Sequence, residues 1–374
     1  MYITSLSLED VRIIKSCDLS FDQGVTAFVG DNGQGKTSLL EAMFWTSHAK
    51  SFRHVSNDDV IRKDCDFAKI ELHLTDGQRP QDIVATINRV GRAGVFVNGQ
   101  RLKRNRDLAT TLRVSVFTPD DLEIIKGSSS FRREILDDAL HQISPKYVAA
   151  YSDYQRTLKQ KNALLKDQHI DFSVLDVLNT SLAVSGSQVL KSRLNALSTM
   201  RETLQSSYRH IADDEPMVGM RYISKIFGND HGEDIDPDED QNVEALQELF
   251  LEKINYYKDI ELRRAHSVVG PHRDDLFLSI DDRDTRTQAS QGEQRTMALA
   301  LKMALHYVVH NATGDNPVLL LDDVFSELDL GRTHRLVESL PSAQTFVTTA
   351  TELPSTLKVD KIFQVKNGEI SSSS

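Results

Sequence analysis

The stretch "GDNGQGKTSLLEAM", from Gly30 to Met43, constrains the fold more than any other part of this 374-residue chain. Gly30 is followed after four residues by Gly35, Lys36 and Thr37, which is the phosphate-binding loop pattern. An apolar run at Val25–Val29 precedes it and a helical pattern from Lys36 to about His48 follows, so the loop has the strand-turn-helix context that the pattern requires. A glycine-rich turn before an ordinary helix is the alternative.

Glycines let such a loop curl until successive backbone N–H groups face phosphate oxygens, and the helix dipole adds to this anion site. We expect Lys36 to supply a positive charge for catalysis and the Thr37 hydroxyl to bind Mg²⁺. The residues expected to bind the nucleotide here are Gly30, Asp31, Asn32, Gly33, Gln34, Gly35, Lys36, Thr37 and Ser38.

A second motif, "NPVLLLDDVFSELD" (316–329), places two carboxylates after a run of apolar residues. The run Val318–Leu321 is typical of a buried parallel strand. In phosphate-loop enzymes a carboxylate at such a strand end holds Mg²⁺, and the next one can polarise the attacking water. The pattern therefore predicts Asp322 as a metal residue and Asp323 as the catalytic base. Two aspartates at a strand end can also be only a turn or a helix cap.

A third motif, "SQGEQRT" (290–296), precedes a helix whose apolar face includes Met297, Leu301 and Leu305. A Ser-x-Gly sequence at a helix N-terminus offers free N–H groups and a hydroxyl, so it can bind an anion, although alone it is more often a cap. Its position shortly before the Asp322 strand favours a nucleotide role. The residues expected here are Ser290, Gln291, Gly292, Glu293 and Gln294.

Together the three motifs indicate a composite ATP site. One subunit would supply the phosphate loop and the carboxylates, and a second copy would supply the helix that begins at Ser290. ATP would then act as a ligand that closes a homodimer, with "SELD" (326–329) at the dimer seam.

The sequence changes character twice along the chain. Residues 1–119 read mostly as strands, and Asn98-Gly99 predicts a two-residue hairpin. Residues 120–267 show helical periodicity instead, with Pro145 opening one helix, and strands return in 268–370. We expect an α/β head in two parts, 1–119 and 268–370, interrupted by a helical arm, with a disordered tail at 371–374.

Composition bounds the partners less than the motifs do. The net charge of −11 argues against a uniformly basic surface, but nucleic-acid binding depends on where basic groups gather, and 99–106, 130–133, 159–166 and 262–264 are locally basic. Each such run alone is more often a solvated face. No apolar run is long enough to span a membrane, and two widely spaced cysteines favour a reduced, cytoplasmic setting.

These motifs resemble the ABC-type ATPases, and within them the heads of the SMC/Rad50 group, whose phosphate loop and signature are separated by a helical insertion. The match is closer to the RecF family of recombination mediators. It rests on "FVGDNGQGKTSLLEA", "FTPDDLEIIKGSSSFRREILD" (117–137), "GPHRDDL" (270–276), "SQGEQRT" and "LLLDDVFSELD".

That resemblance implies an α/β, ABC-type head with a mixed sheet and antiparallel strands, interrupted by an inserted helical arm. It also implies ATP-dependent dimerisation on double-stranded DNA near gaps and single-strand junctions, with slow DNA-stimulated hydrolysis of ATP. The implied partners are RecR and RecO, which help to load RecA in replication and repair.

Some assignments stay open. Thr348 or Thr349 falls where transporter ATPases carry a histidine that senses the terminal phosphate, and no glutamine stands out for a Q-loop. "GPHRDDL" reads equally well as a structural turn, with Arg273 paired to Asp274 or Asp275, and as a ligand contact. The alternatives for function are an ATP-driven switch with incidental hydrolysis and, less favoured, a transporter ATPase subunit.

Overall fold

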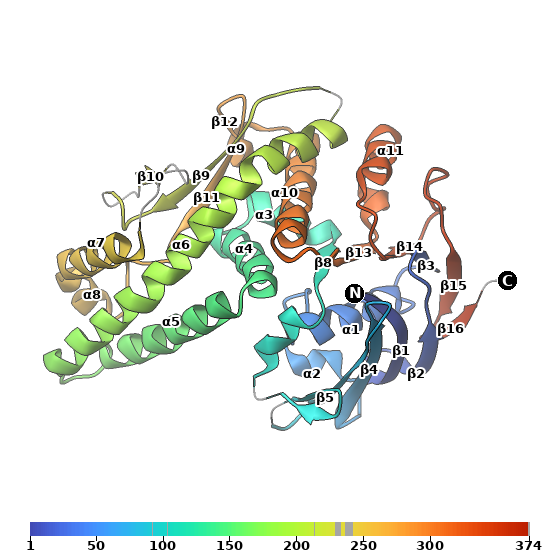
Figure 1. Cartoon of the computed structure of the whole chain (residues 1–374), viewed down its shortest axis with the longest axis horizontal. Helices are drawn as coiled ribbons and strands as arrows, with labels where there is room; N and C mark the ends of the chain where they lie inside the picture. The colour runs from blue at the N-terminus through green and yellow to red at the C-terminus, as the bar shows by residue number, and fades with distance from the viewer. Residues whose placement is uncertain (92, 103, 213, 229–232, 236–241, 373–374) are drawn as a thin grey trace. The chain divides into compact units, whose positions relative to one another are not determined.

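The computed structural model describes the chain except for residues 92, 103, 213, 229–232, 236–241 and 373–374 (Figure 1). The chain forms two compact units, which we describe one at a time. The first contains Met1–Asp121, His210–Asp213 and Val309–Ser374, and the second contains Leu122–Arg209 and Asp214–Val308. The sequence placed residues 268–308 with the head, whereas here they pack with the helical segment.

One sheet of the first unit is antiparallel, with strand order β2-β1-β4-β5-β6-β7. Its strands alternate buried and exposed side chains, as expected for a sheet with one face on the core. The hairpin predicted at Asn98-Gly99 is confirmed, because both residues adopt positive φ between β6 and β7. The strands are β1 Tyr2–Val11, β2 Ile14–Ser20, β4 Phe67–Thr75, β5 Pro80–Asn88, β6 Gly94–Val97 and β7 Gln100–Arg101.

The other sheet of the first unit is mostly parallel, with order β16-β15-β3-β14-β13-β8. As the sequence predicted, β13 is a fully buried parallel strand, and it lies between β8 and β14. Only β16 runs antiparallel, paired with β15. The strands are β3 Val25–Val29, β8 Val114–Phe117, β13 Val318–Asp322, β14 Thr345–Thr349, β15 Lys361–Lys366 and β16 Glu369–Ser372.

Helix α1 (Lys36–His48) contacts strands of both sheets, including β1 and β4 on one side and β13 and β14 on the other. This explains why almost every one of its side chains is buried instead of a single stripe. Helix α1 therefore lies inside the core of the unit and is held on both sides. The shorter elements are α2 Asn57–Val60, η1 Asn105–Thr110, η2 Pro119–Asp121, η3 Val324–Glu327 and α11 Leu330–Ser339.

The second unit is built on long helices. Pro145 occupies the first turn of α5, as predicted, and Ser144 caps that helix by accepting the Tyr147 N–H. The helices are α3 Leu122–Lys126, α4 Ser129–Ile143, α5 Pro145–Leu164, α6 Phe172–Ile211, α7 Val243–Tyr256, α8 Lys258–Arg264, α9 Thr285–Gln288 and α10 Gln291–Thr313, the last continuing into the first unit from Val309.

Two predictions about secondary structure are wrong. The segment 120–267 is not purely helical, because β9 (Val218–Ser224) pairs with β11 (Asp275–Ile280) in a sheet of order β10-β9-β11-β12. Its other strands are β10 Glu233–Ile235 and β12 Arg283–Asp284. Ser371 and Ser372 were expected in a disordered tail but belong to β16, where Ser372 pairs with Phe363; residues 373–374 lie outside the described chain.

Candidate functional site

The phosphate loop lies between the carboxyl end of β3 and the start of α1, at one edge of the parallel sheet. Gly35 is the N-cap of α1 with φ of 111°, a conformation that strains any residue with a side chain. Gly30 is required for a different reason: a Cβ there would lie 2.2 Å from the Val365 carbonyl oxygen. The loop therefore curls as predicted, and of its remaining residues Asp31 and Asn32 are exposed while Ser38 is buried.

Lys36 turns its ammonium group back over the loop. Its Nζ donates hydrogen bonds to the carbonyl oxygens of Gly30, at 2.6 Å, and Asp31, at 2.8 Å. Burial lowers the pKa of Lys36, while the charges of Asp323, Asp322 and Asp31 act in the opposite direction. The lysine is thus held by neutral oxygens that a phosphate could replace.

Thr37 and Asp322 meet although they are 285 positions apart in the chain. The Thr37 hydroxyl donates to Asp322 Oδ1 at 2.8 Å, and the Thr348 hydroxyl donates to the same oxygen at 2.7 Å. Burial raises the pKa of Asp322, and the two hydroxyl groups oppose that rise. The negative charge of Asp323 raises the pKa of Asp322 further, and the positive charge of Arg53 lowers it. The carboxyl ends of β3 and β13 bring the predicted metal residues together.

Asp323 follows β13 in the left-handed conformation, with φ of 50°. Its N–H lies 3.1 Å from the Thr348 carbonyl oxygen, and its carbonyl accepts the hydroxyl of Ser326 in η3. Its Oδ1 atom is buried and has no hydrogen-bond partner in the described structure. A buried carboxylate oxygen without a donor is costly unless a ligand or water completes it, so Asp323 is available to bind one.

The residues at this edge fit Mg²⁺. Magnesium is usually bound through one or two carboxylates together with phosphate oxygens and water. Thr37 and Asp322 supply one hydroxyl and one carboxylate within hydrogen-bond distance of each other, beside the loop expected to hold the phosphates. Within the described part of the chain no group of three or more His, Cys, Asp or Glu side chains could hold a metal by itself.

Gln34 has a partner that the sequence did not reveal. Its side-chain Oε1 accepts the Asn367 N–H at 2.6 Å, and its carbonyl accepts the Gly368 N–H at 2.9 Å. Asn367-Gly368 is the turn between β15 and β16, and both residues have positive φ. The last hairpin of the chain therefore supports the phosphate loop, and the side chain of Gln34, expected to bind nucleotide, is used in this contact.

A pocket of about 580 Å³ adjoins the loop, because one of its lining residues, Ile13, also lies 3.2 Å from where a Cβ on Gly35 would be. Arg12 lines it and is fixed by two bonds, of 2.7 and 2.8 Å, to the buried Glu41 of α1. Sequence reasoning missed these residues, since "LEDVRIIK" reads only as a strand and turn. The rest of the lining is Asp58, Asp59, Ile61, Lys63, Asp64, Cys65, Asp66 and Arg89.

The signature residues lie in the second unit, at the start of α10. Ser290 and Glu293 form a capping box: the Ser290 hydroxyl accepts the Glu293 N–H at 3.3 Å, and Glu293 accepts the Ser290 N–H at 2.6 Å. Hydrogen bonds from the Ser290 side chain and from the Ser290 backbone N–H to the Glu293 carboxylate lower the pKa of Glu293. Gln294 is buried, and its amide donates to the carbonyls of Thr285 and Arg286 in α9. In the first turn Gln291 is exposed and Gly292 is half-buried.

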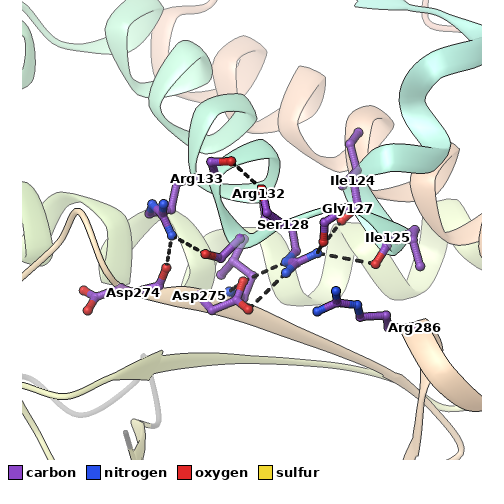
Figure 2. A network of polar contacts seen from close by, with 12 residues as sticks. Ile124, Ile125, Gly127, Ser128, Arg132, Arg133, Asp274, Asp275 and Arg286 are labelled. Atoms are coloured by element: carbon purple, nitrogen blue, oxygen red, sulfur yellow. Dashed lines mark hydrogen bonds and ion pairs between the residues drawn. The ribbon is translucent and has the colours of Figure 1, made fainter. Parts of the chain in front are cut away.

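The segment "GPHRDDL" forms a turn into β11, closed by the Arg273 N–H bonding the Gly270 carbonyl at 2.8 Å. The pairing suggested for Arg273 is wrong, because its guanidinium donates to the Ser267 carbonyl. Asp275 is bound by Arg132 of α4, and Arg133 donates to the Asp274 carbonyl, as Figure 2 shows.

Further buried groups complete this network. Arg193, only 2% exposed, donates to both oxygens of Asp137 and to the Pro271 carbonyl. The Tyr154 hydroxyl lies 2.6 Å from His272 Nδ1, and burial lowers the pKa of His272 to about 3. Burial also raises the pKa of Asp274 to about 6. The residues of this segment that the structure describes serve the fold of the second unit.

No helix within the described residues is both long and apolar enough to cross a membrane. Cys17 and Cys65 are free thiols.

Comparison with known proteins identifies similar chains along the whole length. The family model for the RecF/RecN/SMC N terminal domain matches residues 2–372. The curated protein "DNA replication and repair protein RecF" of Bacillus pumilus is 34% identical over 378 residues, which cover 99% of this chain and 100% of that one. A solved structure of "the recombination mediator protein RecF-ATP in RecFOR pathway" has a TM-score of 0.90 at 28% identity and covers 100% of this chain and 98% of its own.

A more distant structure shows the fold alone. The Smc head domain of Pyrococcus furiosus, solved with the C-terminal domain of ScpA, has a TM-score of 0.56 at 17% identity, with 100% of this chain and 96% of that chain covered. The α/β head with a mixed sheet and antiparallel strands, predicted from the sequence, is confirmed by this likeness and by the strands described above.

Proposed function

This chain belongs to the RecF family, within the RecF/RecN/SMC group, and from that premise we propose that it is a cytoplasmic DNA-repair ATPase that closes as a dimer on ATP. The dimer binds double-stranded DNA near gaps and single-strand junctions. It acts with RecO and RecR in recombinational repair and replication restart, where RecA is loaded, and it hydrolyses ATP slowly with stimulation by DNA.

The observation that carries this proposal is the 2.8 Å contact between the Thr37 hydroxyl and Asp322 Oδ1 beside Lys36. It joins a phosphate loop, a hydroxyl and a strand-end carboxylate at one edge of a parallel sheet, which is the arrangement that phosphoryl-transfer ATPases use. Thr37 and Asp322 would hold Mg²⁺, whose charge neutralises the β- and γ-phosphates when it is bound.

The other groups at this edge have separate tasks. Lys36 exchanges the Gly30 and Asp31 carbonyls for phosphate oxygens, and its positive charge stabilises the transferred group. Backbone N–H groups of residues 31–38 face the phosphates. Asp323 positions the attacking water and accepts its proton, and its unpartnered buried oxygen supports this role. An aspartate is short for this task, which agrees with slow turnover.

The composite site needs a group that closes over the terminal phosphate. We assign that task to Ser290–Gln294 of a second copy, whose capped helix start offers N–H groups to an anion. Within these five residues Ser290, Gln291 and Gly292 are the contacts we expect, because Gln294 is buried against α9. ATP then links two chains at two equivalent sites.

DNA binding would use basic groups that dimer closure aligns in two copies, since one chain carries a net charge of −11. Contacts of this kind go to the phosphate backbone, so they depend little on base sequence and weaken steeply as salt rises.

The test is sedimentation of the protein with Mg²⁺ and ATP, with and without a duplex that carries a single-strand gap, at two salt concentrations. We expect an ATP-dependent dimer and a shift with gapped duplex that is lost at high salt. Ser290→Arg should keep ATP binding by the monomer and abolish the dimer, because the larger side chain blocks the trans contact. A normal dimer from this variant would overturn the composite site.

Two further variants separate an ATPase from a switch. Lys36→Arg should still bind ATP but lose hydrolysis by roughly 100-fold or more, since a guanidinium does not fit a site built for a point charge. Asp323→Asn should dimerise with ATP but hydrolyse it roughly 100-fold more slowly in a single turnover. If Asp323→Asn hydrolyses ATP at the wild-type rate, Asp323 is not the base and hydrolysis is incidental to a conformational switch.

A further inference from the structure

Two adjacent threonines end β14, and their hydroxyl groups are used differently. Thr349 bonds within the following turn, with its hydroxyl 3.1 Å from the Thr351 carbonyl and 3.1 Å from the Thr351 N–H. Thr348 instead faces β13, where it is the register partner of Asp322. Both residues are almost completely buried, so neither hydroxyl is held by bulk water.

The Thr348 hydroxyl connects the two carboxylate residues. It donates to Asp322 Oδ1 at 2.7 Å, and it accepts the Asp323 N–H at 3.0 Å. A threonine hydroxyl has one proton to donate, so the bond to Asp322 uses it completely. Its acceptor capacity is directed at Asp323, so no donor remains for a phosphate oxygen.

The second of these bonds acts on a strained backbone. Asp323 has φ of 50° and ψ of 28°, a left-handed conformation that is unfavourable for a residue with a Cβ. Such conformations persist where the surroundings fix them. The Thr348 hydroxyl and the Thr348 carbonyl both bond the Asp323 N–H, which fixes the direction in which the chain leaves β13 and therefore where the Asp323 carboxylate points.

We propose that Thr348 is a positioning residue for ATP hydrolysis, which orients the Asp322 carboxylate through its proton and the Asp323 backbone through its oxygen. It does not contact the terminal phosphate. This inference rests on the proposed ATPase function. The hydrogen bonds at Asp322 fit this role. Thr37 and Thr348 both donate to Asp322 Oδ1, so the Thr348 hydroxyl still holds this oxygen when the Thr37 hydroxyl turns to a ligand.

The test compares Thr348→Val, which removes the hydroxyl at nearly constant shape, with Thr348→Ser, which keeps it. Thr349→Val is the matched control, because it removes a buried hydroxyl one position along the same strand. For each protein, single-turnover hydrolysis is measured at saturating ATP. The affinity for a fluorescent ATP analogue is measured in EDTA and along a Mg²⁺ series, and the thermal unfolding midpoint reports folding.

We expect Thr348→Val to hydrolyse ATP roughly 10- to 100-fold more slowly, from loss of a hydrogen bond to a charged group and of the Asp323 anchor. Its affinity in EDTA should stay within about twofold of wild type, because Lys36 and the loop N–H groups are unchanged, while the Mg²⁺ needed for tight binding should rise several-fold. Thr348→Ser should recover hydrolysis to within about threefold, and Thr349→Val should resemble wild type.

Three outcomes would overturn the proposal. The first is normal hydrolysis together with a normal Mg²⁺ dependence in Thr348→Val. The second is a fall in its affinity for ATP in EDTA as large as its fall in hydrolysis, as for a direct phosphate contact. The third is a loss of hydrolysis in Thr349→Val as large as that in Thr348→Val. If the wild-type protein binds ATP but does not hydrolyse it, the proposed ATPase function fails. Thr348 is then judged by the Mg²⁺ series alone, where a normal response of Thr348→Val rejects it and a raised Mg²⁺ requirement supports it.

Discussion

Gly30–Thr37, Asp322 and Asp323 lie at one edge of the parallel sheet in the first unit, which we call the nucleotide edge because we propose that it binds ATP. The Gly270–Asp275 turn of the second unit is also polar, but the charges at the two places are balanced in opposite ways. At the nucleotide edge, no ion pair joins Lys36, Asp322 or Asp323 to an opposite charge within the described residues, and Lys36 bonds to carbonyls instead. In the second unit, Arg132 pairs with Asp275 and Arg193 with Asp137, each at short range.

This difference separates a binding site from a structural network. Unpaired charges at a sheet edge are unfavourable in the free protein, and a ligand of the right charge relieves them. Charges that are paired inside a unit need no ligand, and removing one member of the pair leaves the other buried and uncompensated. Mutations at the two places should therefore affect different measurements: nucleotide binding and hydrolysis at the first, stability at the second.

The largest expected effect is on stability, from Asp137→Ala in the second unit. It leaves the fully buried Arg193 without its carboxylate and removes the acceptor of the Tyr147 hydroxyl, which lies 2.6 Å from Asp137. Breaking a buried pair in this way costs roughly 3–5 kcal/mol of the free energy of unfolding. Chemical denaturation of the variant measures the loss.

Asp153→Ala is the matched control, since Asp153 pairs with Arg156 on an exposed face of the same unit. An exposed pair contributes little, so this variant should unfold like wild type. The comparison would be broken if Asp137→Ala were as stable as Asp153→Ala, or if Asp137→Ala retained its fold but lost ATP binding.

A smaller effect is expected from pH, through two buried groups with opposite signs. His272 has a pKa of about 3 in the folded protein against an ordinary value of 6.5, so stability is lost as pH falls below 6.5. Asp274 has a folded pKa of about 6 against 3.8, so stability is gained as pH falls through 6. Between pH 7 and 5 the wild-type contributions largely cancel.

Single variants should expose each contribution. His272→Asn, which keeps an acceptor for the Tyr154 hydroxyl, should become more stable by about 1 kcal/mol between pH 7 and pH 5. Asp274→Asn should lose about 2 kcal/mol over the same range. Denaturation curves at pH 7 and pH 5 give the change in the free energy of unfolding of each variant, independently of what the substitution costs at pH 7. A change of the same sign and size in both variants would contradict the pKa shifts of His272 and Asp274.

Local patterns were enough to predict the nucleotide edge. The strand-loop-helix order around Gly30–Thr37 and the apolar run that ends at Asp322 each carry their structure in adjacent residues. The composite-site prediction then placed the loop and the carboxylates of one chain together, and the contact between Thr37 and Asp322 agrees with it. Pro145 and Asn98-Gly99 were predicted correctly for the same reason, because the backbone chemistry of one or two residues decides them.

Features that depend on distant partners were not predicted. Strand β9 alternates buried and less buried residues, but it lies among long helices in the sequence, and its pairing with β10 and β11 fixes it as a strand. The partners of "GPHRDDL" could not be assigned, because they come from helices more than 70 residues away: Arg132 pairs with Asp275, and Arg193 donates to the Pro271 carbonyl. Buried contacts of this kind leave no periodic signal in the sequence.

The smallest expected effect concerns Gln34, where a contact across 333 positions reaches the nucleotide edge. Gln34→Ala removes the acceptor of the Asn367 N–H and leaves the second bond, from the Gly368 N–H to the Gln34 carbonyl, in place. Loss of one such bond should cost about 0.5–1.5 kcal/mol of stability without nucleotide. The affinity for ATP should fall about 3- to 10-fold, because a looser loop must be ordered on binding.

Gln34→Glu is the control that keeps the hydrogen bond to the hairpin. A carboxylate still accepts the Asn367 N–H, so stability without nucleotide should match wild type, although the added charge should weaken ATP binding. If Gln34→Ala were instead as stable as wild type without nucleotide and weak only in binding ATP, the side chain would be a ligand contact and the last hairpin would not hold the loop. Stability of the free protein is therefore the measurement that separates a loop held by the hairpin from a loop held by its nucleotide.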